Sequence, residues 1–178
     1  MVQISSPHPD ITQYDEVFTD EEKCKISGCC NSMPFNIGLQ SVSEDEMYIH
    51  SLINGSDWHS SSNPIKDCFE KTKAFSQLLS DHKLAGVAVN VYTVADCQDT
   101  RCYPSNEVII YFTNIEWKSE FGGDILFYDA HGKSVVCAIP CVPNRMIVFK
   151  GDMIHRISTP NQYMLTTFTA LFNKQQHT

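Results

Sequence analysis

The chain has 178 residues, of which 42% are hydrophobic and 19% are charged, a composition that excludes intrinsic disorder and a collagen-like repeat and fits one globular domain. Thirteen lysines and arginines stand against 21 aspartates and glutamates, and the resulting formal charge of -8 disfavours nucleic acid as a partner, because phosphate binding needs a basic surface. No basic segment followed by an apolar run opens the sequence, and no apolar stretch approaches the roughly 18 residues of a membrane span, so we expect a cytoplasmic protein without a membrane partner.

The first half of the chain is predicted to be mainly helical. Residues 19–22, with the sequence TDEE, form a capping box, so a short helix is expected to begin at Asp20. Residues 27–62 are rich in Ser, Asn and Gly and indicate loops and irregular strands. Asn and Pro at 63–64 are typical of a helix start, and apolar residues then recur at three- and four-residue steps. This spacing predicts one long helix over residues 64–82.

The second half is predicted to consist of strands. β-Branched and aromatic residues gather in short runs, separated by clusters of Asp, Asn, Gly and Pro. The predicted strands cover residues 87–92, 108–113, 124–128, 134–139, 145–149 and 163–172. Helices that precede an antiparallel sheet indicate the α+β class, and six to eight such strands can close into a jelly roll with a ligand-sized mouth. We expect a single domain over residues 1–178, with helical support over about 14–85 and a β core over about 86–173.

The eight cysteines do not indicate a disulfide framework or a zinc site. No export signal accompanies them, so reduced thiols are expected. No C-x-x-C pair occurs in the sequence, which disfavours a structural zinc site of the usual spacing.

Four motifs in the predicted β core resemble those of a known enzyme family. They are VIIYFTNIEW at 108–117, GGDILFYD at 122–129, NRMIVF at 144–149 and MIHR at 153–156. Their order and spacing resemble the catalytic core of prolyl-4-hydroxylase-like dioxygenases, which use Fe(II) and 2-oxoglutarate. The resemblance covers roughly residues 87–172 and implies a double-stranded β-helix, or jelly-roll, core with N-terminal support helices.

The resemblance also implies a ferrous iron held by a His-X-Asp pair and a distal histidine. His155 matches the distal histidine. The pair is expected between Tyr92 and Val108, where the sequence contains no histidine. The nearest match is Cys97-Gln98-Asp99, in which a thiolate would replace imidazole and Asp99 would remain the carboxylate.

The position of this pair depends on the residue from which the motif is counted. Counting from Asn114 puts the pair near 95–98, whereas counting from Tyr92 puts it at 101–103. Asp99 is the favoured second ligand because a carboxylate is a hard oxygen donor suited to ferrous iron. Cys97 is the minority candidate, because a thiolate beside bound dioxygen risks its own oxidation.

The cosubstrate site departs from the family in one further place. The family carries an Arg or Lys about ten residues after the distal histidine, to pair with the far carboxylate of 2-oxoglutarate, and Leu165 stands there in this chain. Another cation must then serve, or 2-oxoglutarate is not bound in the usual way. The candidate cations are Arg145, Lys150 and Arg156, and Tyr111 and Tyr92 are candidate cosubstrate contacts.

Three functions follow from these observations. The leading prediction is a non-haem iron oxygenase that uses dioxygen to oxidise, by hydroxylation, an amino-acid, peptidyl or small-molecule C–H bond. The second is an altered metalloenzyme that does not use 2-oxoglutarate. The third is a degenerate jelly-roll binding module without catalysis.

Overall fold

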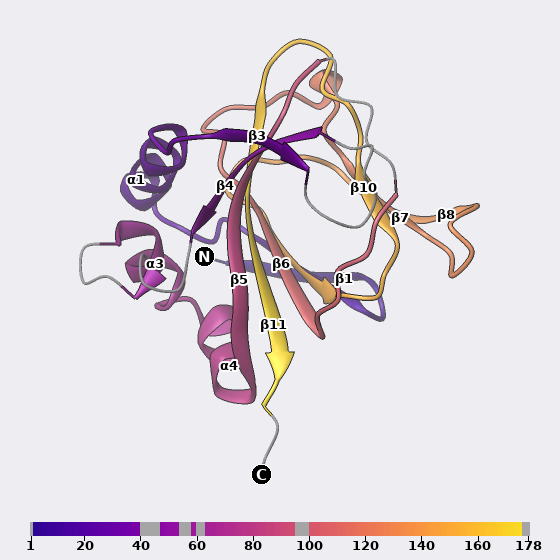
Figure 1. The fold of residues 1–178 in the computed structure, drawn as a ribbon, viewed down its shortest axis with the longest axis horizontal. Coiled ribbons are helices and arrows are strands. Elements are labelled where there is room, and N and C mark those ends of the chain that lie inside the picture. Colours follow the sequence, from indigo (N-terminus) through magenta and orange to yellow (C-terminus); the bar gives the residue numbers. More distant parts are fainter. Residues whose placement is uncertain (1, 40–46, 54–57, 60–62, 95–99, 176–178) are drawn as a thin grey trace.

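The fold is that of a computed structural model, which describes residues 2–39, 47–53, 58–59, 63–94 and 100–175. An eight-stranded main sheet has the order β1-β2-β9-β6-β11-β5-β4-β3, and a three-stranded small sheet has the order β10-β7-β8 (Figure 1). The elements, in chain order, are β1 (Gln3–His8), β2 (Ile11–Asp15), α1 (Asp20–Asn31), β3 (Asn36–Leu39), β4 (Met47–Ile53), α3 (Pro64–Phe69), α4 (Lys73–Asp81), β5 (His82–Tyr92), β6 (Glu107–Phe112), a 3-10 turn (Ser119–Phe121), β7 (Ile125–Tyr128), β8 (Val135–Ile139), β9 (Met146–Lys150), β10 (His155–Ile157) and β11 (Leu165–Lys174).

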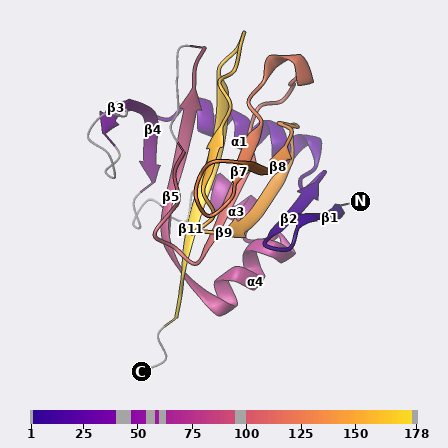
Figure 2. The same cartoon turned by 90° about the vertical axis from the view of Figure 1, so that its right-hand side faces the viewer.

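The helices cover one face of the main sheet, which we call the outer face (Figures 1 and 2). Alternate residues of β5, β6 and β11 point to this side and pack against α1, α3 and α4. Phe69 of α3 stacks on Phe168 of β11, with ring centroids 4.2 Å apart. Burial of these aromatic rings stabilises the packing of the helices on the sheet.

The opposite, inner face of the main sheet packs against the small sheet. Tyr92, Phe112 and Leu165 of the main sheet form a second buried cluster with Ile125 and Phe127 of β7. Two antiparallel sheets that enclose one core form the predicted jelly roll. The α+β class and the jelly-roll core are therefore confirmed.

The predicted strands correspond to β5 to β9 and β11, whereas the long predicted helix is two helices. α3 ends at Phe69, and Thr72 caps a new helix by accepting a hydrogen bond from the Phe75 amide at 3.3 Å. The Thr72 hydroxyl also donates to the Phe69 carbonyl at 2.8 Å. The break lets Phe69 and Phe75 both pack into the core, where their ring centroids are 5.7 Å apart. The prediction of one helix over 64–82 was wrong, because the apolar spacing continues across the break.

The first half of the chain also contributes strands to the main sheet, of which β3, β4 and the start of β5 lie in the region predicted as helical support over about 14–85. β2 pairs with β9, with Ile11 opposite Phe149, and β1 forms the outermost strand beyond it. At the other edge, β4 pairs with β5 and β3 follows. Within the described residues, no helix is long and apolar enough to cross a membrane.

Candidate functional site

His155 is the first residue of β10 and is completely buried. Its ring lies among three aromatic rings, those of Phe149, Tyr103 and Phe127, at centroid distances of 5.0, 5.2 and 6.0 Å. β10 begins where the chain leaves a turn after β9, and pairing of His155 with Phe127 of β7 orients the imidazole toward the second core. The jelly roll thus places one histidine in an apolar interior.

The hydrogen bonding of His155 defines its chemistry. Nδ1 lies 2.9 Å from the Met153 carbonyl oxygen, which can only accept, so the ring proton is on Nδ1. Nε2 is buried and has no hydrogen-bond partner in the structure. Burial lowers the pKa of His155 to about 3, the Met153 hydrogen bond opposes this shift, and the charge of Arg101 adds to it. The imidazole is therefore neutral, with a free Nε2 lone pair, which is the form that binds metals.

Arg101 lies directly opposite His155. The two residues exchange both backbone hydrogen bonds, each 2.8 Å long, in an isolated antiparallel bridge. The Arg101 guanidinium donates to the Tyr92 hydroxyl at 3.0 Å and its Cζ lies 5.8 Å from the centre of the Tyr103 ring. Of the registers that the sequence left open, the structure brings 101–103 beside His155, and this segment contains neither histidine nor carboxylate.

Asp99 and Cys97, the predicted partners of His155, lie outside the described residues. Their roles as metal ligands stay predictions. Among the residues that the structure describes, no three His, Cys, Asp or Glu side chains gather closely enough to hold a metal ion.

Tyr111 and Arg145 are not brought to His155. Tyr111 points to the outer face, where its ring meets that of Phe18 at 5.2 Å and its hydroxyl donates to Asn144 at 3.3 Å. Burial raises the pKa of Tyr111 far above its usual value. Arg145 forms a two-pronged ion pair with Asp15, with N···O distances of 2.6 and 3.0 Å. Neither side chain lies beside His155, and their roles as cosubstrate contacts stay predictions. β6 is buried on both faces, so its sequence pattern does not reveal which face Tyr111 takes.

The other candidate cations also have different roles. Lys150 pairs with Glu107 on the neighbouring strand. Arg156 lies over the Tyr128 ring, with Cζ 5.8 Å from its centre. Leu165 is fully buried opposite Tyr92, so the site has an apolar residue there. The cation that does approach His155 is Arg101, which sequence reasoning missed, although counting from Tyr92 points to its segment.

The described residues supply one ligand for ferrous iron, His155, which does not by itself make a metal site. A neutral, completely buried imidazole with an unpartnered Nε2 is a suitable nitrogen donor, and the Met153 carbonyl fixes its orientation. The positive charge of the Arg101 guanidinium repels a metal cation that binds nearby. A ferrous site would therefore need carboxylate ligands, and Asp99 is the predicted one.

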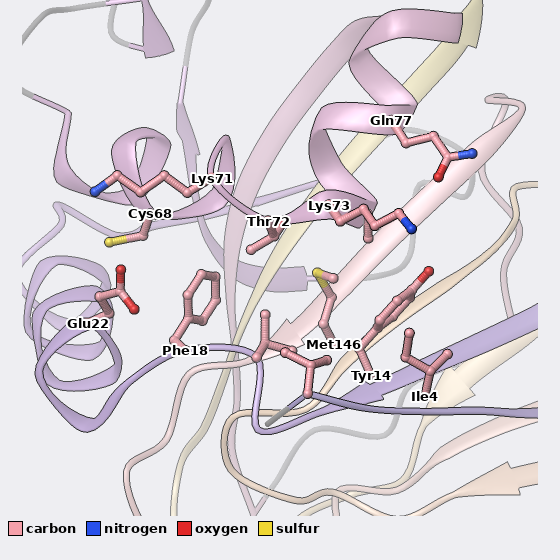
Figure 3. A pocket seen from close by; sticks show the side chains of 13 residues that line it. Ile4, Tyr14, Phe18, Glu22, Cys68, Lys71, Thr72, Lys73, Gln77 and Met146 are labelled. Atoms are coloured by element: carbon pink, nitrogen blue, oxygen red, sulfur yellow. The ribbon is translucent and has the colours of Figure 1, made fainter.

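Two cavities lie on other parts of the protein, away from His155. One of about 480 Å³ lies between the N-terminal hairpin and the helices. Figure 3 shows Phe18, Met146, Tyr14 and Ile4 along one wall and Thr72, Lys73 and Gln77 along the other. A more open hollow of about 1130 Å³ is lined by residues that include Phe35, Trp117, Phe121 and Tyr163. Neither contains His155 or Arg101.

Comparison with known proteins supports the fold. No protein family model matches the chain, and no curated protein matches it. A prolyl-4-hydroxylase from Pseudomonas putida superposes with a TM-score of 0.72 at 12% identity and covers 93% of both chains. A viral collagen prolyl hydroxylase from Paramecium Bursaria Chlorella virus-1 has a TM-score of 0.64 at 11% identity and covers 97% of this chain and 96% of its own. A prolyl hydroxylase from Trichoplax adhaerens, solved with a hypoxia inducible factor peptide, has a TM-score of 0.63 at 14% identity. The match covers 93% of this chain and 84% of the Trichoplax chain. The chain has the fold of the 2-oxoglutarate and Fe(II) oxygenases.

Proposed function

We propose that the protein is a non-haem iron oxygenase in which His155 is a metal ligand. The observation that carries the proposal is the buried, unpartnered Nε2 of a neutral imidazole inside a jelly roll. Among the described residues, no hydrogen-bond donor satisfies this nitrogen, and an unsatisfied buried acceptor costs about 1–3 kcal/mol. A bound metal would remove that cost.

The residues around His155 have separate tasks in this proposal. The Met153 carbonyl holds the imidazole in the ligating tautomer. The rings of Phe127, Phe149 and Tyr103 exclude water from the imidazole. Asp99 supplies the carboxylate ligand, and Cys97 is the alternative donor in the same segment. The iron, when bound, supplies dioxygen activation for oxidation of a C–H bond.

The fold relatives support a proposal for the class of substrate. One relative was solved with a peptide, and we propose a peptidyl, amino-acid or other small-molecule C–H bond as the target. 2-Oxoglutarate is the proposed cosubstrate class, as in the oxygenases that share the fold.

Anaerobic titration with Fe(II), followed by metal content and by the visible absorption after addition of 2-oxoglutarate, tests the proposal. The wild-type protein should bind one iron, and His155→Ala should lose most of that affinity. His131→Ala removes an exposed turn histidine and should bind as the wild type does. Asp99→Asn should also weaken binding. Equal iron affinity in His155→Ala and the wild type would contradict the assignment.

A second function, a non-catalytic jelly-roll binding module, is favoured by one observation. A guanidinium stands opposite His155 in the bridge where a metal-ligand pair would be placed by the register counted from Tyr92. If the wild-type protein binds no iron, this function replaces the first. Iron binding without the absorption that depends on 2-oxoglutarate would instead support a metalloenzyme that uses no 2-oxoglutarate.

A further inference from the structure

The cavity between the N-terminal hairpin (β1 and β2) and the helices α3 and α4 forms a groove on the outer face of the main sheet, which we call the hairpin groove. Its volume of about 480 Å³ lies in the range of pockets that hold small molecules. Phe18 and Met146, which line it, belong to the outer core cluster, whereas His155 packs on Phe127 and Phe149 of the inner one. The main sheet therefore separates the hairpin groove from the proposed metal site.

The floor of the hairpin groove is a row of side chains across three strands. Ile4 of β1 lies directly opposite Tyr14 of β2, and Tyr14 lies directly opposite Met146 of β9. Directly opposed residues of antiparallel strands point to the same face, and Phe18 continues this floor along the groove (Figure 3). Met146 is buried, but Ile4 is 64% exposed. The row thus leaves apolar surface that a ligand would remove from water.

Three hydrogen-bond donors gather at one end of the hairpin groove. Figure 3 shows the Lys73 amine and the Tyr14 hydroxyl at the same end, and Gln77 follows Lys73 by one turn on α4. No hydrogen bond or ion pair joins these three side chains to another described residue. Burial raises the pKa of Tyr14 above its usual value, so its hydroxyl keeps its proton. An ammonium, a phenol and a primary amide together can donate to one carboxylate.

The opposite end of the groove has a different charge pattern. Glu22 lies there beside Cys68 and Lys71 (Figure 3), and the charges of Glu22 and Lys71 both act on the Cys68 thiol. Glu22 Oε2 accepts from the Thr19 amide at 3.1 Å and from the Thr19 hydroxyl at 3.0 Å, so this carboxylate already caps α1. Among the described residues that line the groove, Glu22 is the only carboxylate. An anionic head therefore fits the Lys73 end, away from Glu22, and Lys71 repels a cationic head at the Glu22 end.

We infer that the hairpin groove binds a single-chain amphiphile with one anionic head, of the fatty-acid class. The carboxylate accepts from Lys73, Tyr14 and Gln77 at one end, and the hydrocarbon chain covers the apolar floor from Ile4 to Phe18. Charge complementarity selects the head, and the exposed apolar floor selects the tail. This site is separate from His155, so the inference does not rest on the proposed function.

Calorimetry on the full-length protein with three ten-carbon probes tests the inference, each probe below its critical micelle concentration. Decanoate has an anionic head, decanol a neutral head and decyltrimethylammonium a cationic head. Decanoate should bind at least about fivefold more tightly than decanol, and decyltrimethylammonium should bind most weakly. Octanoate, which is shorter by two methylene groups, should bind about tenfold more weakly than decanoate if the chain is buried.

Two lysine variants locate the head of the ligand. Lys73→Met keeps a hydrocarbon stem but removes the charge, so it should weaken decanoate about fivefold and leave decanol unchanged. Lys71→Met is the matched control, because Lys71 is also exposed but lies at the other end of the groove. It should leave the affinity for decanoate unchanged. Ile4→Ser replaces an exposed floor residue and should weaken decanoate and decanol alike, by about threefold.

Equal affinities for decanoate and decanol would overturn the inference, as would equal effects of Lys73→Met and Lys71→Met or no binding of decanoate. Sedimentation velocity tests another occupant of the hairpin groove. A wild-type dimer that becomes a monomer in Ile4→Ser would assign the groove to a second copy of the chain and would also overturn the inference. None of these measurements needs a metal, so their result is independent of whether His155 binds iron.

Discussion

Arg101 and His155 face each other across an antiparallel bridge, joined by two backbone hydrogen bonds of 2.8 Å. Their side chains therefore start from the same face, and the guanidinium charge contributes to the low pKa of His155. One strand bridge thus pairs a metal-binding type of side chain with a fixed cation. In the proposed metal site, the charge of Arg101 would oppose the binding of a cation at His155.

Neutralising this cation should strengthen metal binding. Arg101→Gln removes a positive charge beside the proposed site, so the affinity for Co(II) should rise by about fivefold to tenfold, since like charges repel even at an effective dielectric constant of about 20. Arg101→Lys keeps the charge and should change the affinity less. Titration followed by the visible spectrum of Co(II) measures both, and a weaker affinity in Arg101→Gln would show that Arg101 supports the site instead.

Gly151 should tolerate no side chain. A Cβ at this position would lie 2.0 Å from the Ser105 carbonyl oxygen, and the Gly151 carbonyl accepts from the Tyr103 amide at 2.8 Å. Gly151→Ala must shift the backbone of the segment that leads to Arg101, and should lower the free energy of unfolding by about 2–4 kcal/mol. Gly28→Ala is the matched control, because apart from its chain neighbours and the backbone of its own helix no atom lies within 4 Å of the added Cβ. Because alanine favours the helix more than glycine does, Gly28→Ala should raise the free energy of unfolding by up to about 1 kcal/mol. Urea unfolding measures the free energy of unfolding of both variants. Equal changes in this free energy for Gly151→Ala and Gly28→Ala would refute the steric argument.

The Asp15–Arg145 ion pair should make stability depend on pH. Partial burial raises the pKa of Asp15, but hydrogen bonding and the charge of Arg145 outweigh it, so the pKa lies below its usual value. Because the pKa of Asp15 is lower in the folded than in the unfolded protein, the ionised carboxylate stabilises the folded state at pH values above the unfolded pKa, near 3.8. This stabilisation is lost as the pH falls through the pKa of the folded protein. Asp15→Asn should cost about 1 kcal/mol at pH 7. The difference from the wild type should shrink below pH 4 in urea unfolding, and a constant difference would exclude the ion pair as its cause.

Thiol reactivity should separate the cysteines into two groups. Cys24 and Cys102 are exposed, whereas Cys30, Cys68 and Cys141 are buried. Burial raises the pKa of Cys30 to about 12 and also raises that of Cys68, so these thiols stay protonated and unreactive at pH 8. Iodoacetamide followed by peptide mass spectrometry should label the exposed pair first. Early labelling of Cys30 in the folded protein would contradict the packing of α1.

Local patterns in the sequence were sufficient for much of the architecture. The capping box at residues 19–22 starts α1, because its hydrogen bonds join residues three apart. The runs of β-branched and aromatic residues correspond to strands β5 to β9 and β11, because side chains of this kind pack well on a pleated surface. The prediction of His155 at a strand edge rested on the motif order and needed no long-range information.

Only the tertiary structure decided which side chains meet. The N-terminal hairpin became part of the main sheet through pairing of β2 with β9, more than 100 residues away in the chain. Tyr111 went to the outer face and Arg145 to Asp15, because both faces of β6 are apolar and a charge has no sequence-local signal for its partner. The meeting of Arg101 with His155 likewise depends on a bridge between segments 54 residues apart. Periodicity reports the face of an element, whereas a site is made by contacts between elements, and those follow from how the two sheets close on one core.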